Sequence, residues 1–105
     1  MFVRLTHLKF LPEHLNDIKK IYKDEVIPVV KKQKGNQKVM LLEPLDKSED
    51  FISITEWKTK ADAEIYESSG TYRKLVDKIR HLLTKEPVLK TYQVEVISEM
   101  AATVK

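Results

Sequence analysis

Three aromatic side chains with polar groups are the residues of this sequence best suited to bind a ligand or take part in a reaction. Trp57 ends an apolar run, and Tyr66 and Tyr72 lie on either side of Gly70. Tyrosine hydroxyls can orient a polar ligand in an otherwise apolar cavity. Packing in the core is the alternative at each position, because large rings bury a large area wherever they lie. We expect Tyr66 to line a substrate pocket, and Trp57 and Tyr72 either to line the same pocket or to pack in the core.

The three histidines are too far apart in the sequence to indicate a metal site. None of them forms the H-x-H or H-x-x-x-H spacing of paired metal ligands. His14 and His81 are expected on solvated helix surfaces. His7 differs, because it shares one face of a strand with Val3 and Leu5, and it is a candidate for catalysis. A hydrogen-bonded histidine with a structural role is the alternative there.

Several reaction classes are excluded by what the sequence lacks. It has no cysteine, which excludes thiolate chemistry and disulfide bonds. With two glycines it cannot build the loops that bind phosphates or dinucleotides, and it has no serine nucleophile motif. Glu25, at the edge of an apolar helical stripe, is expected to pair with Arg4 or a lysine rather than act as a general base. Any catalysis would depend on a shaped apolar pocket or on a bound cofactor.

The first half of the chain predicts a strand, a helix and a second strand. Residues 2–10 alternate in pattern and carry apolar side chains on both faces. A helix is expected from Pro12 to about Ile27, where Pro28 ends or kinks it, because proline disfavours helical geometry in the residue before it. Consecutive apolar residues within 38–43 indicate a second strand that is buried on both faces.

The second half predicts a third strand, a broken helix and a fourth strand. Residues 51–57 form the third strand. Thr59 and Asp62, three residues apart, have the pattern of a capping box that opens a helix. Gly70 divides this helical region into two pieces. Residues 88–97 alternate as the fourth strand.

This order of elements predicts an α+β fold of the ferredoxin-like βαββαβ type, a four-stranded antiparallel sheet with both helices on one face. The first three strands carry apolar residues on both faces, so the face away from the helices would expose an apolar patch. Pairing of two such sheets in a homodimer would cover this patch. The domain is expected to span residues 1–97, followed by a tail at residues 98–105.

Composition indicates a single globular domain. The chain has 105 residues, and its charged fraction of 33% beside an apolar fraction of 42% is typical of a well-solvated globular protein. No apolar run approaches the ~20 residues that a membrane helix needs. The absence of cysteine fits a reducing compartment. We therefore expect a cytoplasmic protein that does not bind a membrane.

Nucleic acid is not favoured as a partner. The net charge is +3, but most lysines alternate with acidic residues, as expected of a solvated surface. An RNA-recognition module shares the predicted order of elements, yet its third strand is rich in glycine and aromatic residues. Residues 51–57 contain no glycine, and aromatic residues occur only at the two ends.

The order of elements and two segments resemble the antibiotic biosynthesis monooxygenase superfamily of dimeric α+β barrels. The segments are Val26-Ile27-Pro28 to Gly35, and Glu56-Trp57-Lys58-Thr59-Lys60 leading to Tyr66, Ser69 and Tyr72. The likeness extends over residues 1 to about 97. It implies a homodimer whose two sheets pair into a barrel.

Members of this superfamily include cofactor-free oxygenases of polycyclic phenols and quinols, heme-degrading enzymes and an isomerase of a signalling sugar phosphate. Phenol-oxidising members use tryptophan and tyrosine near the pocket, and Trp57 and Tyr72 are the counterparts here. Heme-degrading members use an asparagine, a tryptophan and a histidine at positions that fall on Thr6, Tyr66 and Val76. Because a valine cannot ligate iron, the resemblance does not imply heme degradation.

Two functional hypotheses follow from this resemblance and from the residues. The first is a small oxidoreductase of the monooxygenase type that acts on an aromatic or quinol-type small molecule without a metal or cofactor. Its pocket would lie between the sheet and the helices, near His7, Trp57, Tyr66 and Tyr72, with Thr6 at its wall. The alternative is a non-catalytic dimeric module that binds a small molecule, which the lack of a recognisable acid, base or ligand set favours.

Overall fold

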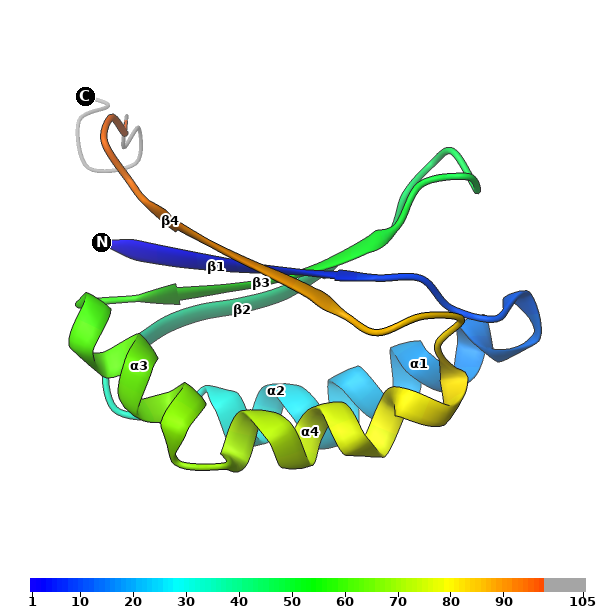
Figure 1. The fold of residues 1–105 in the computed structure, drawn as a ribbon, viewed down its shortest axis with the longest axis horizontal. Helices are drawn as coiled ribbons and strands as arrows, with labels where there is room; N and C mark the ends of the chain where they lie inside the picture. Colours follow the sequence, from blue (N-terminus) through cyan, green and yellow to red (C-terminus); the bar gives the residue numbers. More distant parts are fainter. Residues whose placement is uncertain (98–105) are drawn as a thin grey trace, which may run out of the picture.

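The computed structural model describes residues 1–97 as a four-stranded antiparallel sheet with one layer of helices (Figure 1). The strands are β1 (Phe2–Leu8), β2 (Asn36–Leu42), β3 (Phe51–Trp57) and β4 (Val88–Gln93), in the spatial order β2-β3-β1-β4. The α-helices are α1 (Leu15–Ile21), α2 (Ile27–Val30), α3 (Lys60–Ser68) and α4 (Thr71–Ile79). Two 3-10 turns, η1 (Pro12–His14) and η3 (Arg80–Leu82), and a π-helical segment, η2 (Tyr22–Val26), complete the helical layer. The predicted α+β, ferredoxin-like fold is confirmed.

The register of β1 decides which of its side chains reach the helices. Thr6 pairs with Ser53 of β3 on one side and with Leu89 of β4 on the other. Because side chains alternate between the two faces of a strand, Arg4, Thr6 and Leu8 point to the same face. All three are buried, so this is the face that the helices cover.

The first helical region continues through Pro28 to Val30, beyond the end expected at about Ile27. Of the two effects predicted for Pro28, an end or a kink, the first does not occur. The helix passes from α1 into the π-helical segment η2, and α2 then runs on to Val30. Proline has no N–H to donate, and in an α-helix its ring clashes with the carbonyl four residues earlier. The π segment widens the turn before the proline, because the N–H of Ile27 donates to the carbonyl of Tyr22, five residues back.

The second helical region agrees with the prediction. The hydroxyl of Thr59 accepts a hydrogen bond of 3.1 Å from the backbone N–H of Asp62, which caps the start of α3. Gly70 separates α3 from α4 and has a φ of +87°, in the left-handed region that glycine adopts without strain. The chain turns at this break, and α4 begins at Thr71, so that Tyr72 lies in its first turn.

Strands β1 and β4 are shorter than predicted. β1 ends at Leu8, and Phe10 forms only an isolated bridge with Leu83. β4 ends at Gln93 rather than at residue 97. The N–H of Val94 still donates to the carbonyl of Met1 beyond the end of β4. The predicted tail at residues 98–105 lies outside the described residues.

The core fills the space between the sheet and the helical layer. One cluster of buried residues surrounds Trp57 and includes residues of η2, α3 and α4, while a second lies between β1, α1 and η3. Trp57 and Ile18 are completely buried, and Val30 is 1% exposed. Within residues 1–97, no helix is both long and apolar enough to cross a membrane.

The sheet face away from the helices is apolar, and we call it the open face. By strand register it carries the apolar residues Val3 and Leu5 of β1, Met40 and Leu42 of β2, Ile52 and Ile54 of β3, and Val88 and Tyr92 of β4, together with His7 and the charged residues Lys38, Glu56 and Lys90. All of these side chains are partly or fully exposed in the single chain, with Tyr92 at 50%. The predicted two-sided apolar character of the first three strands is therefore present.

Candidate functional site

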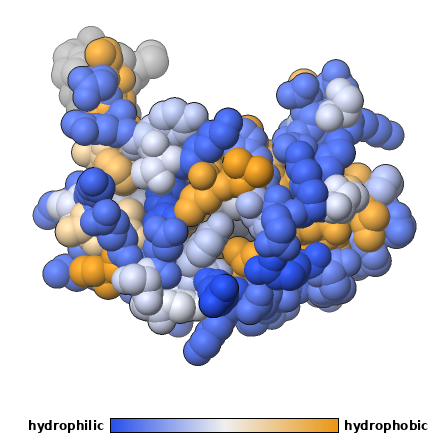
Figure 2. Space-filling view, in the orientation of Figure 1, coloured by the Kyte–Doolittle hydropathy of each residue, from blue (hydrophilic) through white to orange (hydrophobic). Residues whose placement is uncertain are grey.

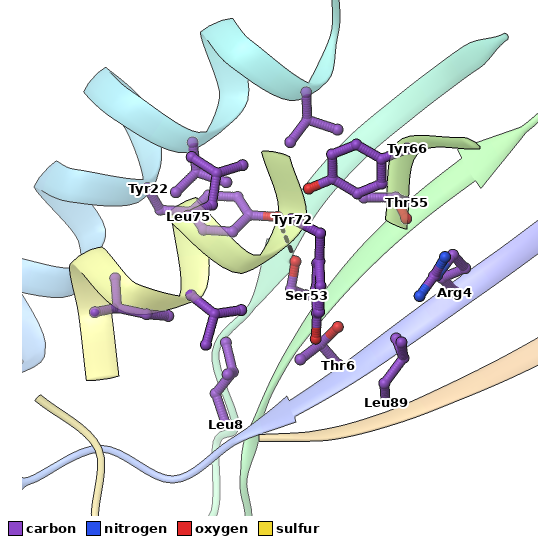
Figure 3. Close-up of a pocket in the computed structure, with 14 residues that line it drawn as sticks. Arg4, Thr6, Leu8, Tyr22, Ser53, Thr55, Tyr66, Tyr72, Leu75 and Leu89 are labelled. Carbon is purple, nitrogen blue, oxygen red and sulfur yellow. Dashed lines mark hydrogen bonds between the residues drawn. The ribbon is translucent and has the colours of Figure 1, made fainter. Parts of the chain in front are cut away.

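A small cavity lies between the sheet and the helical layer (Figure 3). Its volume is about 50 Å³, enough for a few water molecules but well below the ~300–1,000 Å³ of typical ligand pockets. The lining is apolar with a few polar groups, and consists of Arg4, Thr6, Leu8, Tyr22, Val26, Val30, Ser53, Thr55, Tyr66, Tyr72, Leu75, Val76, Ile79 and Leu89. A ligand of aromatic size therefore enters only if part of this wall moves.

The helix-side wall of the cavity includes a hydroxyl that is already committed to the sheet. The hydroxyl of Tyr22 lies 2.7 Å from Oγ of Ser53 and donates to the backbone carbonyl of Met40 at 2.9 Å. Burial raises the pKa of Tyr22 to about 12, although the hydrogen bond with Ser53 acts in the opposite direction. Tyr22 thus joins the π segment to β2 and β3, and its side chain is held in one position.

Trp57, Tyr66 and Tyr72 form a continuous row of aromatic rings. The rings of Trp57 and Tyr66 are stacked, with centroids 5.0 Å apart and an interplanar angle of 27°. Tyr66 meets Tyr72 edge to face at 6.0 Å. The indole N–H of Trp57 donates to Oγ1 of Thr55 at 2.8 Å. Of the three rings, Tyr66 and Tyr72 line the cavity, whereas Trp57 lies behind Tyr66 and supports its ring.

The two tyrosines of this row remain protonated at neutral pH. Burial raises the pKa of Tyr66, and the neighbouring Tyr72 acts in the same direction. Burial also raises the pKa of Tyr72, opposed first by its hydrogen bond with Thr6 and then by Arg4. Figure 3 shows the hydroxyl of Tyr72 directed toward Thr6 on β1. Protonated phenols donate hydrogen bonds, so these side chains suit the recognition of ligand oxygen atoms better than the removal of a proton.

Arg4 is a charged member of the cavity wall that was not among the predicted site residues. Its side chain is only 4% exposed, although it carries a full charge. Nη1 donates to the backbone carbonyl of Ala63 at 3.0 Å, and the guanidinium lies 5.7 Å from the centre of the Tyr72 ring. Nη2 lies 3.1 Å from Oε1 of Glu67. This contact is an ion pair without hydrogen-bond alignment, since Nη2 has no hydrogen-bond acceptor among the described residues. The sequence signal that could have identified Arg4 is its spacing of two residues from Thr6, which places both side chains on the same face of the strand.

The structure brings some of the predicted site residues together and separates others. Thr6, Tyr66 and Tyr72 line one cavity, as expected of a pocket between sheet and helices. Trp57 contacts this group from behind through Tyr66. His7 lies on the open face, on the opposite side of the sheet from the cavity, because it alternates with Thr6 along β1. The catalytic roles proposed for these residues stay predictions.

The other titratable groups that the sequence analysis singled out lie outside the cavity. His14 is 3.2 Å from a carboxylate oxygen of Asp17, and His81 is exposed. Glu25 pairs with a lysine, as expected: Lys78 lies 3.1 Å away, and both side chains are about half exposed. Within residues 1–97, no group of three His, Cys, Asp or Glu residues is arranged to hold a metal ion.

A surface groove lies against the outer side of the cavity wall. Its volume is about 420 Å³, and it is lined by Glu67, Ser68, Gly70, Tyr72, Arg73, Val76, Arg80, Glu86 and Pro87. Tyr72 and Val76 line both spaces, so they form the partition between the inner cavity and this outer groove. Figure 2 shows a hollow with apolar surface on both sides between the sheet and the helical layer.

Comparison with solved structures finds many folds of this kind. A proposed antibiotic biosynthesis monooxygenase from Deinococcus radiodurans has a TM-score of 0.79 at 16% identity, with 96% of this chain and 100% of that chain covered. Rv0793 from Mycobacterium tuberculosis has a TM-score of 0.77 at 12% identity, covering 93% and 98%. A variant of MhuD with two manganese protoporphyrin IX molecules bound per active site has a TM-score of 0.78 at 15% identity, covering 95% and 100%. At these identities the likeness concerns the fold.

The sequence itself identifies the family. No curated protein matches the chain. The family model described as antibiotic biosynthesis monooxygenase matches residues 1–78, a range that includes β1 to β3 and most of the cavity wall. The resemblance found in the segments before β2 and after β3 is thereby confirmed. The chain belongs to the antibiotic biosynthesis monooxygenase family.

Proposed function

We propose that the chain is a cytoplasmic, homodimeric oxidoreductase of the monooxygenase type that acts on an aromatic or quinol-type small molecule without a metal or cofactor. The observation that carries this proposal is the cavity between sheet and helices, whose apolar wall is interrupted by the hydroxyls of Thr6, Tyr66 and Tyr72. A flat, oxygen-bearing ring matches such a wall, because aromatic faces pack against it while its oxygen atoms accept hydrogen bonds. Family membership supports the oxygenase chemistry.

The simplest reaction of this kind converts a phenol with a free ring position into a quinone. One oxygen molecule is consumed, one of its atoms enters the ring as the new carbonyl, and the other leaves as water. The protein's part would be to exclude bulk water and to hold the ring next to the tyrosine hydroxyls. Tyr72 is the best placed of the predicted catalytic residues, since it lines the cavity and is hydrogen bonded to Thr6.

A second function, a non-catalytic module that binds the same class of molecule, is supported by the make-up of the cavity wall. The lining contains no aspartate, glutamate or histidine. The tyrosines there have raised pKa values, so they are poor general bases near neutral pH. A binding module needs neither a base nor an oxygen site, and the same hydroxyls would serve it.

Oxygen uptake in the presence of 1-naphthol separates the two functions. The monooxygenase should consume one oxygen molecule per naphthol and form naphthoquinone. The rate of oxygen uptake should not fall after dialysis of the protein against a chelator. Addition of catalase should release no oxygen, because the reaction produces water and not hydrogen peroxide. Binding of 1-naphthol without oxygen uptake would leave the binding module as the function. Absence of both binding and uptake over a panel of naphthols and quinols would contradict both.

The hydroxyls of the cavity should contribute modestly to ligand affinity. Tyr66→Phe or Tyr72→Phe removes one hydrogen bond to an uncharged ligand, which contributes about 0.5–1.5 kcal/mol, a severalfold change in Kd. Isothermal titration with 1-naphthol measures it. His81→Ala is the control, because His81 is exposed and lines neither the cavity nor the outer groove, and the Kd of this variant should match that of the unmodified protein. Loss of binding in the His81 variant alone would place the site on the outer helix surface.

Heme should not be a substrate. By the family resemblance, Val76 falls at the position where heme-degrading members carry a histidine. It lines the cavity with a hydrocarbon side chain that cannot ligate iron. Titration with hemin should give no defined Soret shift, and a reductant under oxygen should not bleach the Soret band. A stoichiometric complex that bleaches would show that another residue ligates the iron and that the heme prediction is wrong.

The homodimer is proposed from the open face. Its apolar residues extend over all four strands, and an exposed patch of this kind typically marks an interface. Stable interfaces bury about 1,200–2,000 Å² in total, and two sheets packed face to face reach that range. His7 would then lie in the interface and not in the cavity.

A further inference from the structure

The guanidinium of Arg4 has unused hydrogen-bonding capacity at the cavity wall. An arginine carries five N–H donors, and burial makes each unpaired donor costly. Nη1 is engaged by the carbonyl of Ala63, whereas Nη2 makes no aligned hydrogen bond within residues 1–97 and has the ion pair with Oε1 of Glu67 at 3.1 Å. The side chain is 96% buried, so bulk water does not replace the missing acceptor. A donor of this kind in a cavity wall is suited to an acceptor that arrives with a ligand.

We infer that Arg4 anchors the ligand of this cavity, with Nη2 donating to an anionic oxygen, the phenolate oxygen of an ionised phenol. The choice of an aromatic ligand rests on the proposed function, but the role of Arg4 does not require turnover. Figure 3 shows Arg4 and Tyr72 on neighbouring parts of the wall, so a ring held near Tyr72 places its oxygen within reach of the guanidinium.

The surroundings of Arg4 favour a negative ligand charge. Tyr66 and Tyr72 are neutral near pH 7, because burial raises the pKa of both. The balancing carboxylate, Glu67, is half exposed, so water screens its charge, whereas Arg4 is buried. Arg80 also lies near Tyr72, but it is exposed and paired with both Asp77 and Glu86, so the positive charge at this wall comes from Arg4. The inner side of the wall therefore carries an incompletely neutralised positive charge.

The geometry favours a single oxygen over a carboxylate. Bidentate recognition of a carboxylate uses two parallel N–H groups of one guanidinium. Nη1 already donates to Ala63, so end-on pairing through both terminal nitrogens would break a buried hydrogen bond. A phenolate needs one donor, and Nη2 supplies it. Tyr66 and Tyr72 both line the cavity, so their side chains can contact the ring of the same ligand.

Entry of such a ligand requires a movement of Tyr72. The inner cavity of about 50 Å³ is too small for an aromatic ring. The outer groove of about 420 Å³ shares Tyr72 and Val76 with it, and rotation of the half-buried Tyr72 ring would join the two spaces. Together they fall within the ~300–1,000 Å³ typical of ligand pockets. Arg4 would then lie at the inner end of the joined space.

Titration with 4-nitrophenol tests the inference, because its ionised and neutral forms absorb at different wavelengths. The dissociation constant and the pKa of the bound phenol are measured by absorbance for the unmodified protein and for Arg4→Met. The variant keeps a side chain of similar reach but has no charge or donor. Lys74→Met is the control, since Lys74 is exposed on α4, lines neither space and contributes the same net charge.

The unmodified protein should bind nitrophenolate more tightly than nitrophenol and lower the pKa of the bound phenol. A hydrogen bond to a charged group supports a loss of about 10- to 100-fold in phenolate affinity for Arg4→Met, with the bound pKa returning to or above its value in water. Affinity for the neutral phenol should change much less. Lys74→Met should leave both quantities within about twofold of the unmodified protein.

A second variant tests the same inference in the opposite direction and does not remove a buried side chain. Glu67→Gln removes the negative charge that lies 3.1 Å from Nη2 on a half-exposed side chain. Phenolate affinity should rise by about two- to fivefold, and the pKa of the bound phenol should fall further. This variant decides the matter if Arg4→Met does not fold.

The inference is overturned if 4-nitrophenol does not bind, if it binds preferentially in the neutral form, or if Glu67→Gln leaves phenolate affinity unchanged. Its failure is distinct from failure of the proposed function. Phenolate binding through Arg4 without oxygen uptake would remove the oxygenase function and keep the anchor. Oxygen uptake with unchanged phenolate binding in the variants would keep the oxygenase function and remove the anchor.

Discussion

Trp57→Ala is expected to lower the free energy of unfolding by about 3–5 kcal/mol. The side chain is completely buried, so its removal leaves a cavity in the cluster formed by η2, α3 and α4. The stacked contact with Tyr66 is lost as well, and such pairs contribute about 0.5–1.5 kcal/mol beyond the buried area. Because small domains are stable by only ~5–15 kcal/mol, the variant should be close to unfolding at physiological temperature.

Urea unfolding followed by far-UV circular dichroism measures this change, since Trp57 is the single tryptophan and its fluorescence disappears with the substitution. His81→Ala is the control and should remain within about 0.5 kcal/mol of the unmodified protein, because the side chain is exposed. A loss below about 1 kcal/mol for Trp57→Ala would mean that the core around it repacks and that the described packing is wrong.

Trp57→Phe separates the structural role of this residue from the predicted catalytic one. Phenylalanine retains an aromatic ring beside Tyr66 but loses the indole N–H that donates to Thr55. If Trp57 only supports the wall, the folded variant should keep the affinity for 1-naphthol to within severalfold and any oxygen uptake at a similar level. Loss of uptake with unchanged binding would assign Trp57 a part in the reaction.

The fold could be predicted from sequence because each element had a local signal. The capping pattern at Thr59, the left-handed glycine at Gly70 and the apolar alternation of residues 51–57 all recur in the structure. The end of the first helical region could not be predicted in this way. Pro28 normally disfavours helix continuation, and the π segment that accommodates it depends on hydrogen bonding between residues five apart.

The candidate site was only partly predictable for a related reason. Aromatic residues next to a helix break indicated a pocket, and Tyr66 and Tyr72 do line one. Which face of β1 meets the helices depends on strand register and on long-range packing, and the sequence offered apolar residues on both faces. His7 was therefore grouped with the pocket although it lies on the open face, and Arg4 on the other face was passed over.

Ile54→Lys is expected to convert the proposed homodimer into a monomer. Ile54 lies near the middle of the open face, where it pairs with Leu5 of β1 and Met40 of β2. A lysine there would bury an unpaired charge between two apolar sheets, which costs several kcal/mol and raises the dimer Kd by about a thousandfold or more. The side chain points away from the helices, so the fold of each subunit should persist and circular dichroism should be unchanged.

Light scattering after size exclusion, at micromolar concentration, measures the outcome against a chain mass of 12.3 kDa. The unmodified protein should have twice this mass, and Ile54→Lys should have the mass of one chain. Asn16→Lys is the matched control: it adds the same charge at an exposed position on α1, in the helical layer on the other side of the sheet, and should remain dimeric. A monomeric unmodified protein would rule out the paired-sheet dimer, and a dimeric Ile54 variant would place the interface elsewhere. With a monomeric unmodified protein, the open face would have no partner chain. With a dimeric Ile54 variant, His7 would also lie outside the interface, because His7 and Ile54 are on the same face of neighbouring strands.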